Sequence, residues 1–222
     1  MLDLHTHTFH GDARLSPGGL AGRFLDAGYR GVAVTDHADH CNLDWILEHQ
    51  IPGLIRFGPY CGINIFAGVE LTQVPPALIG DMVRTARRGG AELVLVHGES
   101  ISEQVFPGTN LAAIEADADI LAHPGLISDE EVELAAQRGV ALEISVRQGH
   151  CLCNGHIAAA ARRFGAKLVI NSDAHSSSDI PLASMRRHIA LGAGLSEEEY
   201  QKAEGNAEKI ASRILHRGRS LA

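Results

Sequence analysis

The stretch that decides the fold is Met1-Leu2-Asp3-Leu4-His5-Thr6-His7, in which a short apolar run ends in two histidines. The run predicts a β-strand over residues 1–5. Side chains at the carboxyl ends of parallel strands converge on one crevice, where α/β enzymes carry out their chemistry. Six histidines stand where a predicted strand ends, and these are His5, His7, His37, His97, His123 and His175. Their placement predicts one shared site.

Apolar runs with strand character alternate with helical patterns along the chain. Beyond the first strand, they predict strands over residues 31–35, 63–70, 92–97, 120–123, 140–146 and 168–172. This alternation is typical of βα units around a parallel sheet. An open doubly wound sheet usually carries a Gly-rich phosphate-binding turn after its first strand, whereas this first strand ends in histidines. About seven repeats without that turn favour an α/β barrel of the TIM type.

Two regions carry signals for helix boundaries. Pro52-Gly53 interrupts the helical pattern over residues 43–57 and predicts two short helices there. Ser196 and Glu199 have the spacing of a capping box, which predicts the start of a terminal helix. A further helix is predicted near residues 206–216.

The composition predicts a single globular domain. The chain has 222 residues, of which 45% are hydrophobic and 21% are charged, and this is enough to bury one substantial core. We expect one domain over residues 1–222, with terminal helices from about residue 179.

Charge and hydropathy restrict the expected partners. The formal net charge is −8 and the acidic residues are scattered, so no dedicated nucleic-acid binding is expected, although a short oligonucleotide held by metals remains open. No apolar run approaches the roughly 18 residues that a membrane span needs, so no membrane partner is expected. A signal-peptide pattern is also missing, which predicts a cytoplasmic protein. The oligomeric state is left open.

Two histidines and two carboxylates point to metal binding. His5 and His7 lie two residues apart on a strand, so both side chains face the same side and can bind one cation. Glu70 and Asp173 close two further predicted strands. A mixed set of imidazole and carboxylate ligands suits zinc, iron or manganese better than calcium or magnesium. These residues predict a site for more than one metal ion.

Several motifs, taken in order, resemble a known family. They are Asp3-Leu4-His5-Thr6-His7-Thr8, Phe9-His10-Gly11-Asp12, Val34-Thr35-Asp36-His37, Gly68-Val69-Glu70, Val96-His97-Gly98, Ala122-His123-Pro124-Gly125 and Asn171-Ser172-Asp173-Ala174-His175. The pattern spans roughly residues 1–180 and resembles the PHP (polymerase and histidinol phosphatase) family of metal-dependent phosphoesterases, especially its small histidinol-phosphatase-like members. The resemblance implies a distorted (β/α)7 TIM-like barrel. It also implies two or three divalent transition-metal ions (zinc, manganese or iron) at the carboxyl ends of the strands.

The resemblance implies which residues hold the metals. One ion falls to His5, His7, Glu70 and Asp173, and Glu70 bridges to a second ion held by His97 and His123. A third ion falls to Asp12, His37 and His175. His10 lies close enough in sequence to compete with Asp12, and the stretch Phe9-His10-Gly11-Asp12 favours Asp12.

Two further acids neighbour these ligands. Asp3 and Asp36 are expected to orient ligand imidazoles or to accept hydrogen bonds from the loops.

Paired metals predict a hydrolytic mechanism. Two ions about 3.5–4 Å apart hold a bridging hydroxide in line with the leaving oxygen. The predicted catalytic residues are Glu70, as the bridging ligand, and His37 or His175, as the donor of a proton to the leaving alkoxide. Arg147 directly follows a predicted strand, and its planar guanidinium suits phosphate. Arg14 and His150 are further candidate substrate contacts.

The sequence thus predicts a metal-dependent phosphoesterase that hydrolyses a small phosphorylated substrate. One alternative is an amidohydrolase-like hydrolase, but no lysine stands at an internal strand end, and Lys167 begins its strand instead. The other alternative is a metal-stabilised PHP module without catalysis. The substrate and the native metal are left open.

Overall fold

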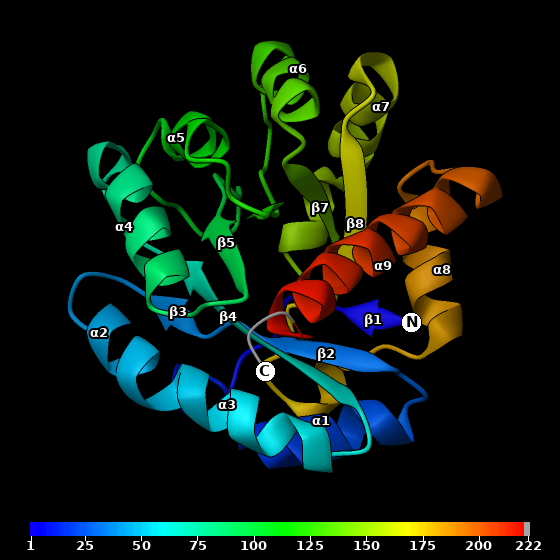
Figure 1. Ribbon diagram of the computed structural model, residues 1–222. Coiled ribbons are helices and arrows are strands. Elements are labelled where there is room, and N and C mark those ends of the chain that lie inside the picture. The colour runs from blue at the N-terminus through cyan, green and yellow to red at the C-terminus, as the bar shows by residue number, and fades with distance from the viewer. Residues whose placement is uncertain (220–222) are drawn as a thin grey trace.

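Seven parallel strands nearly close a barrel in the computed structural model, which describes residues 1–219. In sheet order they are β1 (Leu2–Asp3), β2 (Gly31–Val34), β4 (Asn64–Leu71), β5 (Leu93–His97), β6 (Ile120–Ala122), β7 (Ala141–Ser145) and β8 (Lys167–Asn171). A two-residue strand that was not predicted, β3 (His37–Ala38), pairs with the end of β4. All seven predicted strands are present, which confirms the distorted TIM-like barrel (Figure 1).

The barrel closes through the segments that follow β1 and β8. The His7 N–H donates to the Ala174 carbonyl over 3.0 Å, and the Asp173 N–H donates to the His5 carbonyl over 3.0 Å. Thr6 and Ala174 form a parallel bridge between these hydrogen bonds. Candidate metal ligands from distant parts of the sequence therefore meet at one seam.

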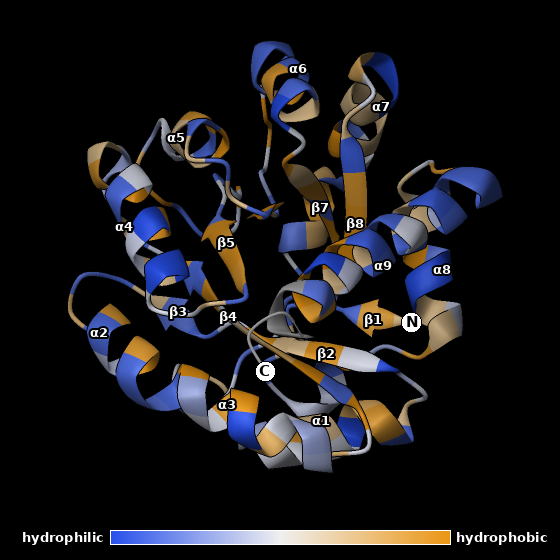
Figure 2. Ribbon diagram, viewed as in Figure 1, coloured by the Kyte–Doolittle hydropathy of each residue, from blue (hydrophilic) through white to orange (hydrophobic). Residues whose placement is uncertain are grey.

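Helices cover the outside of the barrel (Figure 1). They are α1 (Pro17–Asp26), α2 (Leu43–Trp45), α3 (Ile51–Phe57), α4 (Pro76–Arg88), α5 (Thr109–Glu115), α6 (Asp129–Arg138), α7 (Asn154–Phe164) and α8 (Ala183–Gly192). Figure 2 shows mostly apolar strands and helices that mix apolar with hydrophilic residues. This distribution is typical of a parallel sheet that is buried on both faces.

A ninth helix, α9 (Glu197–Arg219), covers the amino-terminal end of the barrel. One face of α9 packs against side chains inside the barrel, and this buried cluster consists of Leu2, Leu4, Ala33, Phe66, Leu93, Leu95, Ile120, Ala141, Val169, Ala207, Ile210, Ala211 and Ile214. The core inside the barrel therefore includes residues from a helix near the far end of the sequence.

The predicted start of this helix is confirmed, but the prediction of two helices is wrong. The Ser196 N–H donates to Glu199 Oε2 over 2.7 Å, and the Glu199 N–H donates to Ser196 Oγ over 3.2 Å. The helix then continues through Gly205. A glycine inside a helix costs about 1 kcal/mol relative to alanine, and burial of the apolar face of α9 offsets this cost.

The two short helices predicted over residues 43–57 are present as α2 and α3, but the predicted interruption at Pro52-Gly53 is wrong, because residues 43–60 are helical throughout. A π-helical turn, Ile46–Gln50, joins α2 to α3, and a 3₁₀ turn, Gly58–Tyr60, follows α3. Pro52 lies in the first turn of α3, where the N–H that proline lacks has no partner within that helix segment. The change from π to α geometry directly before Pro52 therefore accommodates the proline without a loop.

A buried ion cluster ties the last two helices to the barrel. Arg186 of α8 is fully buried and donates to Asp3 Oδ2 (3.2 Å), to the Ile170 carbonyl (2.6 Å) and to Glu204 Oε1 of α9 (2.8 Å). A buried guanidinium is tolerated only when it is paired and hydrogen-bonded, so these contacts fix both helices against β1 and β8.

Of the helices within residues 1–219, none combines the length and apolarity that a bilayer span needs. The single domain over residues 1–222 remains a prediction, and residues 220–222 lie outside the described part of the chain.

Candidate metal centre

The six histidines predicted at strand ends converge at the carboxyl end of the barrel. The ring of His7 lies with its centroid 4.2 Å from that of His37 and 4.3 Å from that of His175. The rings of His97 and His123 are 4.4 Å apart. These side chains come from different strands or from the loops that directly follow them, because a parallel barrel brings all its carboxyl ends together.

Glu70 of β4 lies at the centre of this cluster. Its Oε2 is 2.8 Å from His37 Nδ1 and 3.6 Å from His7 Nε2. Its Oε1 is 3.3 Å from His5 Nε2, and it is also 3.5 Å from His97 Nδ1 and 3.5 Å from His123 Nε2. One buried carboxylate therefore touches five imidazoles. The predicted bridging role links Glu70 to four of them, and the contact with His37 is additional.

Asp173 is a second carboxylate that contacts several of the histidines. Its Oδ1 is 3.1 Å from His7 Nε2 and 3.7 Å from His5 Nε2, and its Oδ2 is 3.8 Å from His123 Nε2. Asp173 and His123 have positive φ angles of 52° and 28°. Such conformations of non-glycine residues cost about 1–3 kcal/mol each and concentrate at functional sites.

The third predicted group also lies together. Asp12 Oδ1 is 3.1 Å from His175 Nε2 and 3.7 Å from His37 Nε2. His10, the competing candidate, lies instead against the ring of Trp45, with 5.2 Å between ring centroids.

The donors fit a cluster of metal ions. Four overlapping groups have ligand atoms within 4.8 Å of one another, and they are His7/Asp12/His37/His175, His5/His123/Asp173, His5/His7/Glu70 and His37/Glu70/His97. Several buried atoms of these residues have no hydrogen-bond partner, among them His7 Nδ1, both ring nitrogens of His97, His123 Nδ1, Glu70 Oε1 and Asp173 Oδ1. Polar atoms are costly to bury without partners, and coordination of a metal would satisfy Glu70 Oε1, Asp173 Oδ1 and one ring nitrogen of His97.

The carboxylates of the cluster stay ionised. Burial alone would raise the pKa of Glu70, but the imidazoles of His5 and His37 hold it well below its ordinary value. The pKa of Asp173 is likewise lowered, because His5 and His7 outweigh its burial. Burial and the neighbouring His37 lower the pKa of His7 to about 4. Ionised carboxylates, and imidazoles whose protons a metal would displace, make a donor set suited to divalent transition metals.

Sequence reasoning missed Glu143, which lies inside β7. Its Oε2 is 2.8 Å from His5 Nδ1 and accepts a hydrogen bond from Asn171 Nδ2 over 2.9 Å. A carboxylate that accepts from one ring nitrogen fixes the tautomer of the imidazole and leaves its other nitrogen free to bind metal. The available signal was an acidic residue between Leu142 and Ile144, where an unpaired charge would be too costly.

Glu103 is the second residue that sequence reasoning missed. It extends from an exposed loop, and its Oε2 lies 3.5 Å from His150 Nε2 and 3.8 Å from His97 Nε2. The contact with His150 lowers the pKa of Glu103 to about 2. Its position in an irregular loop left no pattern to identify it.

Asp3 and Asp36 accept hydrogen bonds from loops and do not contact a ligand imidazole. Asp3 accepts from the Ser172 N–H over 3.0 Å and from the His5 N–H over 3.3 Å. Asp36 accepts from the Thr8 N–H and hydroxyl, each over 2.5 Å. Both acids thus hold the backbone that carries the ligands, which is one of the two expected roles.

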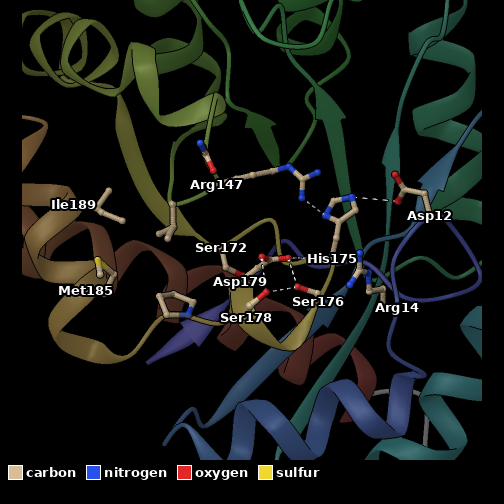
Figure 3. A pocket seen from close by; sticks show the side chains of 13 residues that line it. Asp12, Arg14, Arg147, Ser172, His175, Ser176, Ser178, Asp179, Met185 and Ile189 are labelled. Carbon is tan, nitrogen blue, oxygen red and sulfur yellow. Dashed lines mark hydrogen bonds and ion pairs between the residues drawn. The ribbon is translucent and has the colours of Figure 1, made fainter.

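A cleft of about 790 Å³ opens beside the cluster (Figure 3). Asp12, Arg14, Arg147 and His175 line it, together with the apolar side chains of Val146, Pro181, Met185 and Ile189. Arg147 donates to the Asp173 carbonyl over 3.1 Å and contacts His175 Nδ1. Two of the three predicted substrate contacts, Arg147 and Arg14, therefore border the cleft.

His150, the third predicted substrate contact, lies deeper. It is buried, and its ring stacks on that of His123 with 3.9 Å between centroids. Its Nδ1 is 2.7 Å from Ser100 Oγ. His150 therefore packs against a candidate ligand, and it is not among the residues that line the cleft.

Glycines let the ligand-bearing loops approach one another closely. A Cβ on Gly98, next to His97, would lie 2.4 Å from the Ala122 carbonyl oxygen. A Cβ on Gly125 would lie 1.9 Å from the Glu99 carbonyl oxygen, and Gly125 has a φ of +65°. Only glycine fits such contacts, so the spacing of His97 and His123 depends on these two positions.

Comparison with known proteins found relatives but no matching family model. The chain is 40% identical over 201 residues to the uncharacterized protein MJ1295 of Methanocaldococcus jannaschii, covering 90% of this chain and 92% of the relative. It is 26% identical over 204 residues to ribonuclease P protein component 3 of Methanosarcina acetivorans, covering 84% of this chain and 78% of the relative.

Solved structures show a similar fold. A chain in a cryo-EM structure of archaeal ribonuclease P with mature tRNA matches with a TM-score of 0.72 at 17% identity, covering 95% of this chain and 90% of that one. Histidinol phosphate phosphatase from Lactococcus lactis, complexed with zinc, L-histidinol and phosphate, matches with a TM-score of 0.61 at 16% identity, covering 88% and 94%. These similarities support a PHP-like fold.

The comparisons contradict the prediction that nucleic acid is not a dedicated partner. In both sequence and fold the chain is similar to components of ribonuclease P, and one of the matched structures contains tRNA. That prediction rested on a net charge of −8, which is a sum over the whole chain and does not describe any one face of the molecule. With 40% identity over nearly the full length of both chains, this protein belongs to the same family as MJ1295 of M. jannaschii.

Proposed function

We propose that the protein is a metal-dependent phosphoesterase. The observation that carries the proposal is the position of Glu70, whose two carboxylate oxygens lie within 3.6 Å of five imidazole side chains. Such a carboxylate can join neighbouring metal sites, and phosphoester hydrolysis is a reaction that paired metals serve.

The residues proposed to hold the ions are those that the resemblance to the PHP family implies, and their ligand atoms lie close to one another. His5, His7, Glu70 and Asp173 would hold one ion, Glu70, His97 and His123 a second, and Asp12, His37 and His175 a third. Bound zinc, manganese or iron would polarise the phosphoryl group and make a water molecule nucleophilic near neutral pH.

The remaining steps fall to side chains at the edge of the cleft. Arg147 Nη1 donates to the Asp173 carbonyl and contacts His175, and Arg147 Nε lies 3.6 Å from Asp173 Oδ2, which leaves Nη2 to bind a phosphoryl oxygen. Arg14 lines the same cleft and would bind a further oxygen. His37 or His175 could donate a proton only while it holds no metal, as in a two-ion centre without the third ion. Of the two, His175 is the better placed, because it lines the cleft while His37 is turned toward Glu70 and Thr72.

The amidohydrolase-like alternative has less support. The chain has three lysines. Lys167 is the first residue of β8, and Lys202 and Lys209 lie on α9. All three are therefore at the end of the barrel opposite the histidines, where a carbamylated lysine could not bridge the metals.

A second candidate function is an RNA-associated component like those of ribonuclease P. The observation that favours it is the 26% identity to ribonuclease P protein component 3, which extends over 84% of this chain. In that case the metal centre would stabilise the fold without catalysing a reaction.

Elemental analysis and a phosphatase assay test the main proposal. Protein purified without chelator should contain at least two equivalents of transition metal per chain and should hydrolyse p-nitrophenyl phosphate. Glu70→Ala should abolish turnover while the circular dichroism spectrum is retained. Less than two equivalents of metal, or full activity in Glu70→Ala, would refute the assignment. Metal at full content with no activity on any phosphoester would favour the second candidate.

A further inference from the structure

Four exposed aromatic rings form a continuous row beside the metal centre. The ring centroids of Phe9 and His10 are 4.4 Å apart, those of His10 and Trp45 are 5.2 Å apart, and those of Trp45 and His49 are 5.5 Å apart. The rings of Trp45 and His49 are nearly parallel, with 10° between their planes. Phe9 is 53% exposed and Trp45 is 44% exposed, so the row presents open ring surface to solvent.

The row begins within a few residues of the candidate ligands. Phe9 and His10 lie in the loop between His7 and Asp12. Consecutive Cα atoms are 3.8 Å apart, so the Cα of His10 is at most about 8 Å from that of Asp12. A molecule whose phosphate sits at the metal centre could therefore reach the row with its adjacent part.

A buried carboxylate holds the two halves of the row in place. Asp36 accepts hydrogen bonds from the backbone N–H and the hydroxyl of Thr8, which precedes Phe9. It also accepts from the side-chain amide of Gln50, which lies in the π-helical turn that carries His49. The loop and the helical segment are therefore tied together, and the row exists before any ligand binds.

The composition of the row indicates its ligand. Two of its four rings, His10 and His49, are imidazoles, whose ring N–H groups can donate hydrogen bonds to phosphate oxygens. A surface for an apolar protein segment would be expected to be aliphatic or purely aromatic. Aromatic faces interleaved with ring nitrogens that donate hydrogen bonds suit stacked bases joined by phosphates.

We propose that this row binds single-stranded RNA, with bases stacked on Phe9, His10, Trp45 and His49 and the adjoining phosphate at the metal centre. The inference rests on the proposed phosphoesterase function and names its substrate class. Stacking of a base on an aromatic side chain contributes about 1–3 kcal/mol, which corresponds to a factor of roughly 5 to 150 in the dissociation constant. An RNA with two or more bases beyond the bound phosphate occupies both halves of the row.

Trp45 is the single tryptophan of the chain, so its fluorescence reports directly on the proposed contact. The metal-loaded, unmodified protein is titrated with a penta-adenylate whose 5′ group is a non-hydrolysable methylenephosphonate. The expected result is saturable quenching, which is lost when the probe is an abasic pentamer with the same phosphates. Unchanged fluorescence with the penta-adenylate, or equal quenching by the abasic pentamer, overturns the proposal.

Variants provide a second measurement. Trp45→Ala should weaken binding of a fluorescein-labelled penta-adenylate about tenfold in anisotropy, while Trp45→Phe stays within about threefold. Tyr60→Ala is the matched control, because Tyr60 is 89% exposed and lies outside the row. Equal binding by Trp45→Ala and Tyr60→Ala contradicts the proposal.

Turnover of glycerol 2-phosphate, which has no ring that could stack on the row, separates this proposal from the proposed phosphoesterase function on which it rests. The rate should be the same in Trp45→Ala, Trp45→Phe, Tyr60→Ala and the unmodified protein. If the unmodified protein hydrolyses no phosphoester, the phosphoesterase function is refuted. Fluorescence quenching would still show whether RNA binds to the aromatic row.

Discussion

Replacing Glu143 by glutamine should weaken metal binding without disturbing the barrel. Glu143 is fully buried in β7, and its Oε2 lies between two donors, His5 Nδ1 at 2.8 Å and Asn171 Nδ2 at 2.9 Å. Its Oε1 has no hydrogen-bond partner. A glutamine can therefore keep its oxygen between the two donors and place its amide nitrogen where Oε1 lies. The substitution removes the charge and keeps the packing.

The expected loss of metal affinity depends on whether the variant keeps an acceptor for His5 Nδ1. Loss of an acceptor behind a metal-bound histidine typically costs 10- to 100-fold in affinity, or about 1.4–2.7 kcal/mol. Glu143→Gln keeps an acceptor, so we expect a loss of about tenfold, whereas Glu143→Leu removes it and should approach 100-fold. The assay is competition between the apoprotein and a chromophoric chelator for zinc. Glu133→Gln, a change to an exposed acid on α6, is the control. Affinity within twofold of the unmodified protein in both Glu143 variants would refute the role assigned to this residue.

Further predictions concern the titration of His37, the buried Arg186, the backbone at Gly125 and the substrate contact of Arg147. In the metal-free protein, burial opposes the charged form of His37, yet Glu70 raises its pKa to about 9. Because metal must displace that proton, the metal affinity measured by calorimetry should rise by up to tenfold per pH unit toward pH 9 and then level off. A metal affinity that does not change with pH would contradict this. The ion pair between His37 and Glu70 should contribute its full stabilisation to the apoprotein below about pH 6.5. That contribution should be lost as the pH rises through about 9, and urea unfolding at several pH values would show the loss. Arg186→Met leaves the carboxylate of Asp3 buried without its cation, so urea unfolding should show a loss of about 3–5 kcal/mol, and Asp3→Asn in the same chain should recover part of it. Gly125→Ala should lower the melting temperature more than Gly165→Ala does, because both positions have positive φ but only the added Cβ at Gly125 meets backbone atoms; equal shifts would contradict the predicted clash. Arg147→Ala should raise the KM for phosphorylated substrates several-fold, and an unchanged KM would remove it from the substrate site.

The seven strands were predictable because strands that are buried on both faces appear as continuous apolar runs. β3 was not, since His37–Ala38 is too short to form such a run and exists only through pairing with Glu70 and Leu71. The continuous α9 was also missed, because Gly205 resembles a breaker and the inner barrel residues that stabilise the helix across it are distant in sequence.

Site residues could be predicted where a metal-binding residue type stands at the end of a strand, as the histidines do. Glu143 could not, because it lies within a strand and its partner His5 is 138 residues away in the sequence. The aromatic row shows a similar limit. Nothing in the sequence marks His49 as part of a site, because only the fold brings its helical turn beside the loop of Phe9.

The seam that closes the barrel also has a kinetic consequence. Leu4 and Asn171, which are hydrogen-bonded across it, are 167 residues apart in the chain. Contacts of such long range form late, because the entropy of ordering the intervening chain must be overcome first. His5, His7 and Asp173 therefore come together only after nearly all of the barrel has assembled. An unfinished or misfolded chain would lack the complete donor set. In the folded protein, an ion bound across the seam would slow unfolding, because it must dissociate before the seam can open.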